Sequence, residues 1–239
     1  MIISRNNRSA AAKVCAAVLA LGLLGVTGCF NVPGELPAGS WNYALLINGN
    51  RVGTAVISSR TEGDALVSTT ELTMKAGAIT NVSKQIVTET KDFRPVKLES
   101  YNRIVTGSGT QEINTVAVFN GRKVELVTGS EKNAFEIDRD FRLEGNFMLS
   151  QLIRGKFKKG MIVESWIYEP SIDPETPVLM KARVEGRENV LIGGRELAAV
   201  RVIEYIARVK SFDMFIDEKG VLLKADLTML NTNIQLVRE

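Results

Sequence analysis

Few side chains in this sequence could do acid–base or metal chemistry, because the chain of 239 residues contains no histidine. That composition excludes Ser-His-Asp and Cys-His catalysis and zinc sites with histidine ligands. The sequence also lacks a Gly-x-x-x-x-Gly-Lys-Ser/Thr loop, a Gly-x-Gly-x-x-Gly turn and a Ser-x-x-Lys pair. Most familiar catalytic chemistries are excluded, and we predict a protein that is not an enzyme, with no catalytic residues and no cofactor.

Carboxylates are the remaining candidates. Asp173 and Glu175 lie beside Glu169 in a segment that carries three prolines, and Asp138 and Asp140 form a second acidic pair. Such residues could bind calcium or act as an acid–base pair. Acidic, proline-rich loops are more often simply exposed to solvent, so we predict no metal site and rank a carboxylate-based hydrolase last among the possible functions.

The cysteine at position 29 offers a different chemistry. Arg5, Arg8 and Lys13 precede an uninterrupted run of small and apolar residues at 14–26, and only Thr27 and Gly28 separate that run from Cys29. The run has 13 residues, whereas a helix that crosses a bilayer needs about 20 apolar residues. A basic start, a short apolar middle and a small-residue end predict a secretory signal peptide.

The end of this leader, Val26-Thr27-Gly28-Cys29, resembles the bacterial lipobox. The resemblance implies cleavage before Cys29 and acylation of that residue, whose several acyl chains are enough for stable membrane anchoring. An ordinary signal peptide with an incidental cysteine is the alternative. We therefore expect a signal peptide at 1–28, a lipidated Cys29 with a flexible tether at 29–39, and one β-rich domain at 40–239.

The charge of the chain depends on this leader. The whole chain has 30 basic and 27 acidic residues, and three of the bases lie in the leader. Removing 28 residues leaves 211 with 27 bases and 27 acids. A neutral domain gives no electrostatic reason to bind nucleic acid, so the membrane, through Cys29, is the partner that we expect first.

Alternating apolar and polar residues predict about a dozen strands between 41 and 237, joined mostly by short turns. Asn120-Gly121 is the strongest hairpin signal. The pattern changes once, after Asn146, where apolar residues at helical spacing precede Gly155 and predict a short helix with Asn146 as its cap. The predicted fold is mainly β: a curled antiparallel sheet or half-barrel with one short internal helix.

Four short segments carry a resemblance across most of the domain: Gly49-Asn50-Arg51-Val52-Gly53, Phe93-Arg94-Pro95-Val96, and the runs 193–202 and 215–224. In this order they resemble a family of bacterial envelope proteins of unknown function, related to the lipoprotein carriers of the periplasm. The resemblance implies a lipoprotein-carrier-like half-barrel. The carriers shelter acyl chains inside theirs, but likeness of fold alone does not transfer that role.

A cavity for a hydrophobic ligand is the sharpest hypothesis about the domain. Its walls would be inward-facing residues of the strands: Trp41, Tyr43, Leu45, Trp166, Tyr168, Phe212, Met214, Leu223 and Leu227. The alternative is that these side chains pack against one another and the helix, because protein interiors are close-packed.

Two functions remain in competition. The first is an envelope lipoprotein, lipid-anchored in the outer membrane and facing the periplasm, whose domain binds a lipid or acyl chain. The second is a scaffold that binds an envelope protein partner through an exposed apolar patch or sheet edge. A hollow interior favours the first, and a filled interior favours the second.

Overall fold

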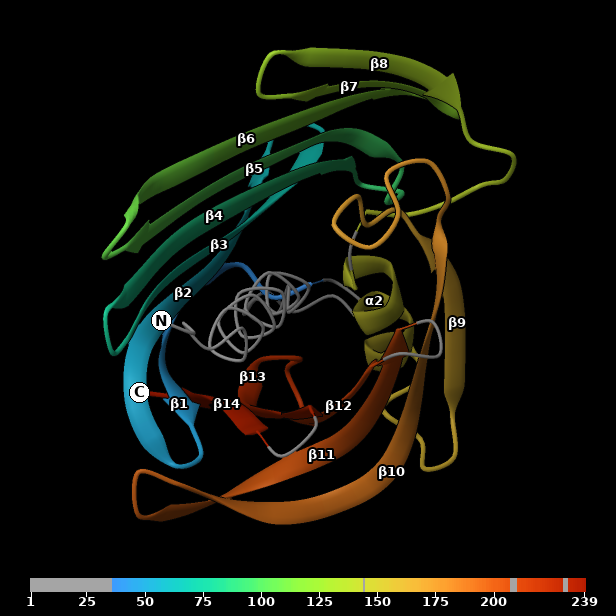
Figure 1. Ribbon diagram of the computed structural model, residues 1–239. Coiled ribbons are helices and arrows are strands. Elements are labelled where there is room, and N and C mark those ends of the chain that lie inside the picture. The colour runs from blue at the N-terminus through green and yellow to red at the C-terminus, as the bar shows by residue number, and fades with distance from the viewer. Residues whose placement is uncertain (1–35, 144, 207–209, 230–231) are drawn as a thin grey trace.

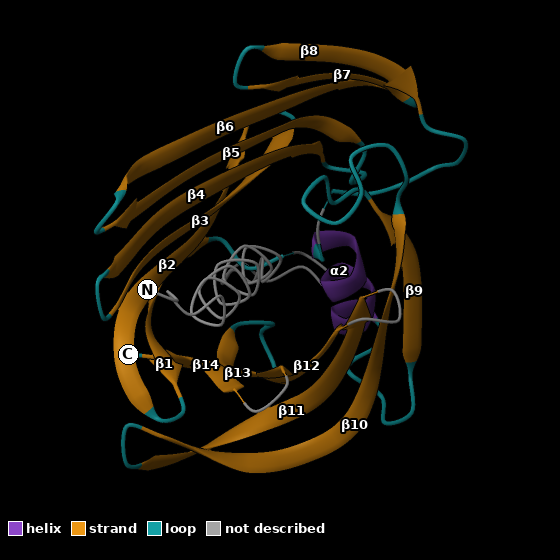
Figure 2. Ribbon diagram, viewed as in Figure 1, coloured by secondary structure: helices purple, strands orange, loops and turns teal. Residues whose placement is uncertain are grey.

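The computed structural model describes residues 36–143, 145–206, 210–229 and 232–239. Within these ranges fourteen strands form a single sheet, and one helix lies on its concave side (Figure 1, Figure 2). The first eight strands are β1 (Gly39–Ile47), β2 (Asn50–Glu62), β3 (Ala65–Ala76), β4 (Ile79–Thr90), β5 (Pro95–Thr106), β6 (Gly109–Asn120), β7 (Lys123–Thr128) and β8 (Glu131–Glu136). The remaining elements are α2 (Asn146–Arg154), β9 (Ile162–Ile167), β10 (Val178–Ile192), β11 (Arg195–Ile206), β12 (Lys210–Ile216), β13 (Leu222–Met229) and β14 (Thr232–Arg238).

Short hairpins explain why the sheet is antiparallel. Neighbouring strands along the chain pair with each other wherever the sheet is continuous, as in β3 and β4, whose register runs from Ala65↔Thr90 to Ala76↔Ile79. The predicted Asn120-Gly121 hairpin joins β6 and β7, and Gly121 adopts φ 61° there, a conformation that glycine reaches without strain. The predictions of a mainly β fold and an antiparallel meander are confirmed.

The order of strands contains one long-range step. The first strand pairs with the last, with Tyr43 opposite Arg238 and Ile47 opposite Ile234. The order across the sheet is therefore β8-β7-β6-β5-β4-β3-β2-β1-β14-β13-β12-β11-β10-β9. As a result β1 and β14, the first and last described strands, lie in the middle of the sheet, and its two edges, β8 and β9, come from the middle of the chain.

The sheet curls until its edges approach each other but does not close. The segment after β8 bridges part of the gap, because the Arg142 N–H donates to the Trp166 carbonyl and the Tyr168 N–H donates to the Arg142 carbonyl, each over 2.8 Å. Helix α2 follows this segment and lies inside the curl beside β9 (Figure 1). The result is a half-barrel with a helix at its seam.

Helix α2 ends as predicted but begins differently. The Gly155 N–H donates to the Gln151 carbonyl at its C-terminus, and Met148, Leu149 and Leu152 are buried. Asn146 was expected to cap the first turn, but the N-cap position is Gly145 and no side chain caps it. The Asn146 side chain is buried, and its amide instead donates hydrogen bonds to Ser68 and Glu89 on the sheet.

Buried apolar side chains form three clusters. The largest lies on the concave side and joins β1–β3, α2 and β9–β14. The second joins β4–β7 to the 137–143 segment and Tyr168. The third is small and contains Val190, Ile192, Ala199 and Leu223, with Phe215 and Val237 against it.

The expected leader, Cys29 and most of the expected tether lie outside the described residues. Its last residues are described: Leu36 packs against the largest cluster and Pro37 is buried. No helix in the described part of the chain is long and apolar enough to cross a membrane.

Candidate ligand-binding pocket

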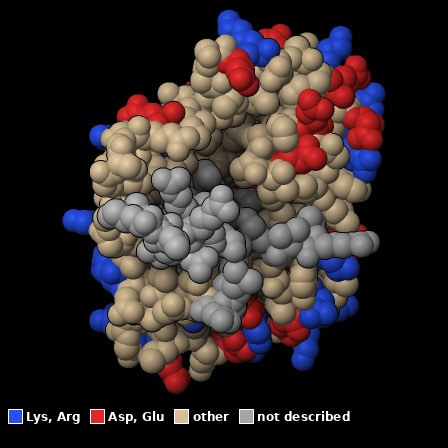
Figure 3. Space-filling model, viewed as in Figure 1, with Lys and Arg blue, Asp and Glu red and all other residues tan. Residues whose placement is uncertain are grey.

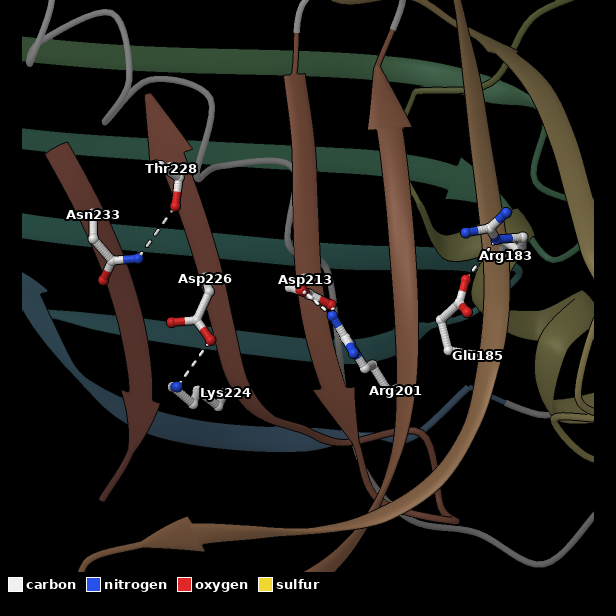
Figure 4. A network of polar contacts seen from close by, with 8 residues as sticks. All are labelled: Arg183, Glu185, Arg201, Asp213, Lys224, Asp226, Thr228 and Asn233. Atoms are coloured by element: carbon white, nitrogen blue, oxygen red, sulfur yellow. Dashed lines mark hydrogen bonds and ion pairs between the residues drawn. The ribbon is translucent and has the colours of Figure 1, made fainter. Parts of the chain in front are cut away.

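The two faces of the curled sheet differ in charge. The convex face carries ion pairs between neighbouring strands, such as Arg201–Asp213 (2.7 Å) and Lys181–Glu164 (2.9 Å). Figure 4 shows three ion pairs on β10–β13: Arg201–Asp213 joins β11 to β12, whereas Arg183–Glu185 and Lys224–Asp226 each lie within one strand. Exposed pairs of this kind add little stability each.

A pocket of about 480 Å³ opens on the concave face of β4–β8. It lies between this part of the sheet and the loop that follows β9. Figure 3, which looks into the open end of the curl, shows a hollow near the centre, bordered mostly by uncharged residues. Its apolar lining comprises Leu98, Ile113, Leu126, Pro170 and Pro174. A volume of this size is typical of small-molecule sites.

Uncharged polar side chains complete the wall. They follow the inward positions of three neighbouring strands, as period two requires: Ser100 and Asn102 on β5, Thr115 on β6 and Thr128 on β7. The hydroxyls of Thr115 and Thr128 lie 3.4 Å apart. Asn102 is only 5% exposed, and its amide oxygen has no hydrogen-bond partner. A buried acceptor without a donor is unfavourable unless something in the pocket supplies one.

The loop that covers the pocket is held in place by aromatic packing. Tyr168 stacks edge-on against Phe119, with ring centroids 5.4 Å apart, and also contacts Phe141. Its hydroxyl donates to the Pro174 carbonyl over 3.0 Å, and Glu169 accepts a hydrogen bond from the Ser171 N–H. Both ends of the 168–174 turn are therefore fixed, so the wall of the pocket is preformed.

A buried polar group lies where α2 meets the sheet. Asn146 Nδ2 donates to Glu89 Oε2 and to Ser68 Oγ, each over 3.1 Å, and the Leu143 N–H donates to Glu89 Oε1. Burial raises the pKa of the Glu89 carboxyl to about 7, although these hydrogen bonds and the charge of Arg142 lower it. These contacts fix the helix to β3 and β4.

Two further polar groups lie buried on the sheet without partners. Neither Glu204 Oε1 on β11 nor the side-chain amide of Asn81 on β4 has a hydrogen bond. Glu204 lies two residues from both Val202 and Ile206 on β11, so the three side chains share one face of the strand, which is the concave face. Burial raises the pKa of the Glu204 carboxyl to about 8, so this group is protonated at neutral pH.

The nine residues predicted to line a cavity are distributed over several environments. Tyr43, Leu45, Phe212, Met214 and Leu227 belong to the largest cluster, and Trp41 packs against it. Tyr168 belongs to the second cluster and Leu223 to the third. Trp166 is 37% exposed and lies under the Arg139 guanidinium, 4.2 Å from the ring centroid. None of the nine lines the pocket that the structure shows.

Local geometry explains why Trp166 and Leu223 depart most from the predicted inward-facing positions. Trp166 on β9 pairs with Leu179 on β10, and both side chains are exposed on the outer face. The neighbouring pair, Ser165 and Met180, occupies the inward positions. Leu223 lies at a bulge in the pairing of β12 and β13, between Phe215 and Ile216. A bulge changes the alternation of side chains, and the sequence gives no sign of it.

The acidic pairs are engaged locally. Asp173 accepts hydrogen bonds from the Glu175 and Thr176 N–H groups, which hold the pKa of its carboxyl below the usual range. The neighbouring Arg139 guanidinium donates two hydrogen bonds to the Asp138 carboxylate, each over 2.7 Å, which makes a bidentate ion pair. Within the described ranges no three acidic or cysteine side chains gather as metal ligands do.

Comparison with known proteins gives the class of fold. No model of a known protein family matches the chain, and no curated protein sequence matches it significantly. A solved structure does: the beta-barrel-like protein of the domain of unknown function DUF1849 from Brucella abortus. The two superpose with a TM-score of 0.58 at 9% sequence identity, over 84% of this chain and 95% of that one. The chain thus shares the barrel-like fold, and the predicted fold class is confirmed.

Two other solved structures align more loosely. A DUF1089-family protein from Pseudomonas aeruginosa has 13% identity and a TM-score of 0.36, over 82% of this chain and 93% of that one. The hypothetical lipoprotein YmcC from Escherichia coli has 12% identity and a TM-score of 0.35, over 89% of this chain and 90% of that one. Scores this low carry no structural argument for this chain. The relation to the lipoprotein carriers stays a prediction.

Proposed function

We propose that this protein is an envelope lipoprotein, anchored in the outer membrane through an acylated Cys29, whose domain binds a hydrophobic ligand such as a lipid. The proposed role is binding rather than catalysis. The anchor rests on the leader sequence, and the ligand rests on the concave face.

The observation that carries the proposal is the pocket of about 480 Å³ on the concave face of β4–β8. Concave, preformed pockets of several hundred Å³ are the usual form of small-molecule sites. Its wall combines Leu98, Ile113 and Leu126 with hydroxyl and amide groups, which suits a molecule with an apolar body and a polar end. Glu204, with its unpaired oxygen, gives the same face a second buried polar group.

A partner-binding scaffold is the second candidate, and one observation favours it. Ile162 on β9 is 50% exposed, and Trp166 and Leu179 are each more than a third exposed on the outer face of β9 and β10. Exposed apolar groups at a sheet edge are typical of protein interaction sites. These residues lie on the other face from the pocket, so the two candidate functions can be tested separately.

Lipid content tests the proposal. The full chain would be purified from a bacterial host and extracted with chloroform and methanol, which releases bound lipid and leaves covalent acyl groups on the polypeptide. The matched variants are Ser100→Trp, which fills the pocket, and Glu99→Trp, which places the same side chain on the opposite face of β5.

We expect lipid in stoichiometric amount from the wild-type chain and from Glu99→Trp, and a clear loss from Ser100→Trp. Thermal melting of the three proteins establishes that each is folded. Equal lipid from both variants would contradict the proposal. Substituting Trp166→Ala should leave the lipid content unchanged, whereas a scaffold would lose its protein partner with that change.

A further inference from the structure

The pocket wall has a charge pattern that restricts which amphiphile it can accept. Its described lining contains the carboxylates Glu131 and Glu169 but no lysine or arginine. An anionic head group would lose its hydration there without gaining a counter-charge from a lysine or arginine of the lining. The lining therefore disfavours phosphate and carboxylate head groups.

The same wall lacks a hydrogen-bond donor at one defined place. Asn102 lines the pocket from β5, is at least nine-tenths buried, and its Oδ1 atom has no partner. Such an atom can only be satisfied by a group that donates, such as a hydroxyl. The hydroxyl pair of Thr115 and Thr128, on the next two strands of the same wall, can donate or accept. Asn102 and this pair together suit a head group with more than one hydroxyl.

We infer that the pocket takes an uncharged lipid with a hydroxyl-bearing head group, which donates a hydrogen bond to Asn102 Oδ1. This inference rests on the proposed function, because it names the ligand class of the same pocket. Leu98 and Leu126, on the inward positions of β5 and β7, would contact the apolar body of the lipid.

The test uses four probes with the same acyl chain: monoolein, its dimethyl ether, oleate and lysophosphatidic acid. Binding to the full chain is measured by displacement of a fluorescent fatty alcohol. The variants are Asn102→Leu, which removes the acceptor, and Asn114→Leu, its control on the exposed face of β6. Methylation of the probe and substitution of Asn102 remove the two partners of one proposed hydrogen bond, so they form a double-mutant cycle.

We expect monoolein to bind the wild-type chain more tightly than its ether by about fivefold to tenfold, the contribution of one neutral hydrogen bond. In Asn102→Leu the difference between the two probes should shrink, because the Asn102 acceptor is gone, and Asn114→Leu should keep the wild-type difference. Oleate and lysophosphatidic acid should bind more weakly than monoolein.

Two outcomes would overturn the inference while leaving the proposed function intact: the ether binding the wild-type chain as tightly as monoolein, or the anionic probes binding more tightly than either. Binding of none of the four probes would instead contradict the proposed function itself. A loss of binding by Asn102→Leu counts only if its circular-dichroism melting curve matches that of Asn114→Leu.

Discussion

Asn146, at the first residue of α2, donates a hydrogen bond of 3.1 Å to Glu89, near the end of β4. Both side chains are almost completely buried. The contact joins the only helix of the described ranges to the strand that borders the pocket, so it fixes the helix relative to the concave face.

Removing this contact should destabilise the fold. Asn146→Ala leaves the Glu89 carboxyl without its side-chain donor, and we expect the free energy of unfolding to fall by about 1–3 kcal/mol, the cost of an unsatisfied buried polar group. Urea unfolding measures it, with Asn42→Ala on the exposed face of β1 as the control. Equal stability of the two variants would show that the contact does not hold the helix.

The pH dependence of stability follows from the buried acids. The pKa of Glu204 rises from 4.5 to about 8 and that of Glu89 from 4.5 to about 7, in both cases mainly by burial. Between the unfolded and folded values the folded state binds more protons, so stability should fall as pH rises from about 4.5 to about 8 and then level off. The total change should be on the order of a few kcal/mol.

A substitution on β11 tests the predicted fall of stability with rising pH. Glu204→Gln keeps the shape of the side chain and removes its titration, so the slope of stability against pH should flatten between pH 5 and 8. Glu196→Gln, on the exposed part of the same strand, should keep the wild-type slope. A wild-type protein more stable at pH 8 than at pH 5 would contradict the assignment.

Close contact between two strands makes Gly53 irreplaceable. A Cβ atom at Gly53 would lie 2.0 Å from the Thr73 carbonyl oxygen and 2.9 Å from the Met74 Cα atom. Backbone atoms cannot move aside without separating β2 from β3, so Gly53→Ala should lower the free energy of unfolding by about 3 kcal/mol or more. Gly107→Ala, with no atom within 4 Å of its Cβ, should melt within a few degrees of wild type.

The predicted anchor can be tested with matched cysteines. Cys29→Ser should abolish incorporation of a clickable palmitate analogue and leave the chain 28 residues longer than the processed protein, whereas Cys15→Ser should do neither. Mass spectrometry of the purified proteins measures both effects. Incorporation of the palmitate analogue by Cys29→Ser would show that the predicted lipobox is wrong.

The sequence predicted the local part of the fold and missed the distant part. Turn chemistry such as Asn120-Gly121 and the alternation of residues indicate each hairpin, because both depend on near neighbours in the chain. Pairing of Tyr43 with Arg238 joins residues at opposite ends of the domain. No local pattern encodes that register, and without it the edges of the sheet could not be located.

The pocket was missed for a related reason. Large apolar residues such as Tyr43 and Phe212 were expected to line a cavity, but they pack in the largest cluster, as big apolar side chains usually do. The pocket lies instead where smaller polar residues, Ser100 and Asn102, occupy inward positions of β5. A polar residue at an inward position is visible in the alternation, but its meaning depends on the loop at 168–174, whose place is set by the curl.

Cross-linking would test the central claim, that the concave face of β4–β8 binds a lipid. The full chain would be irradiated with a monoacylglycerol that carries a diazirine on its acyl chain, and the modified peptides identified by mass spectrometry. We predict adducts on inward positions of β5–β7, near Leu98, Ile113 and Leu126, which excess monoolein suppresses. Adducts confined to the outer face around Trp166 and Leu179, or unaffected by monoolein, would contradict the account.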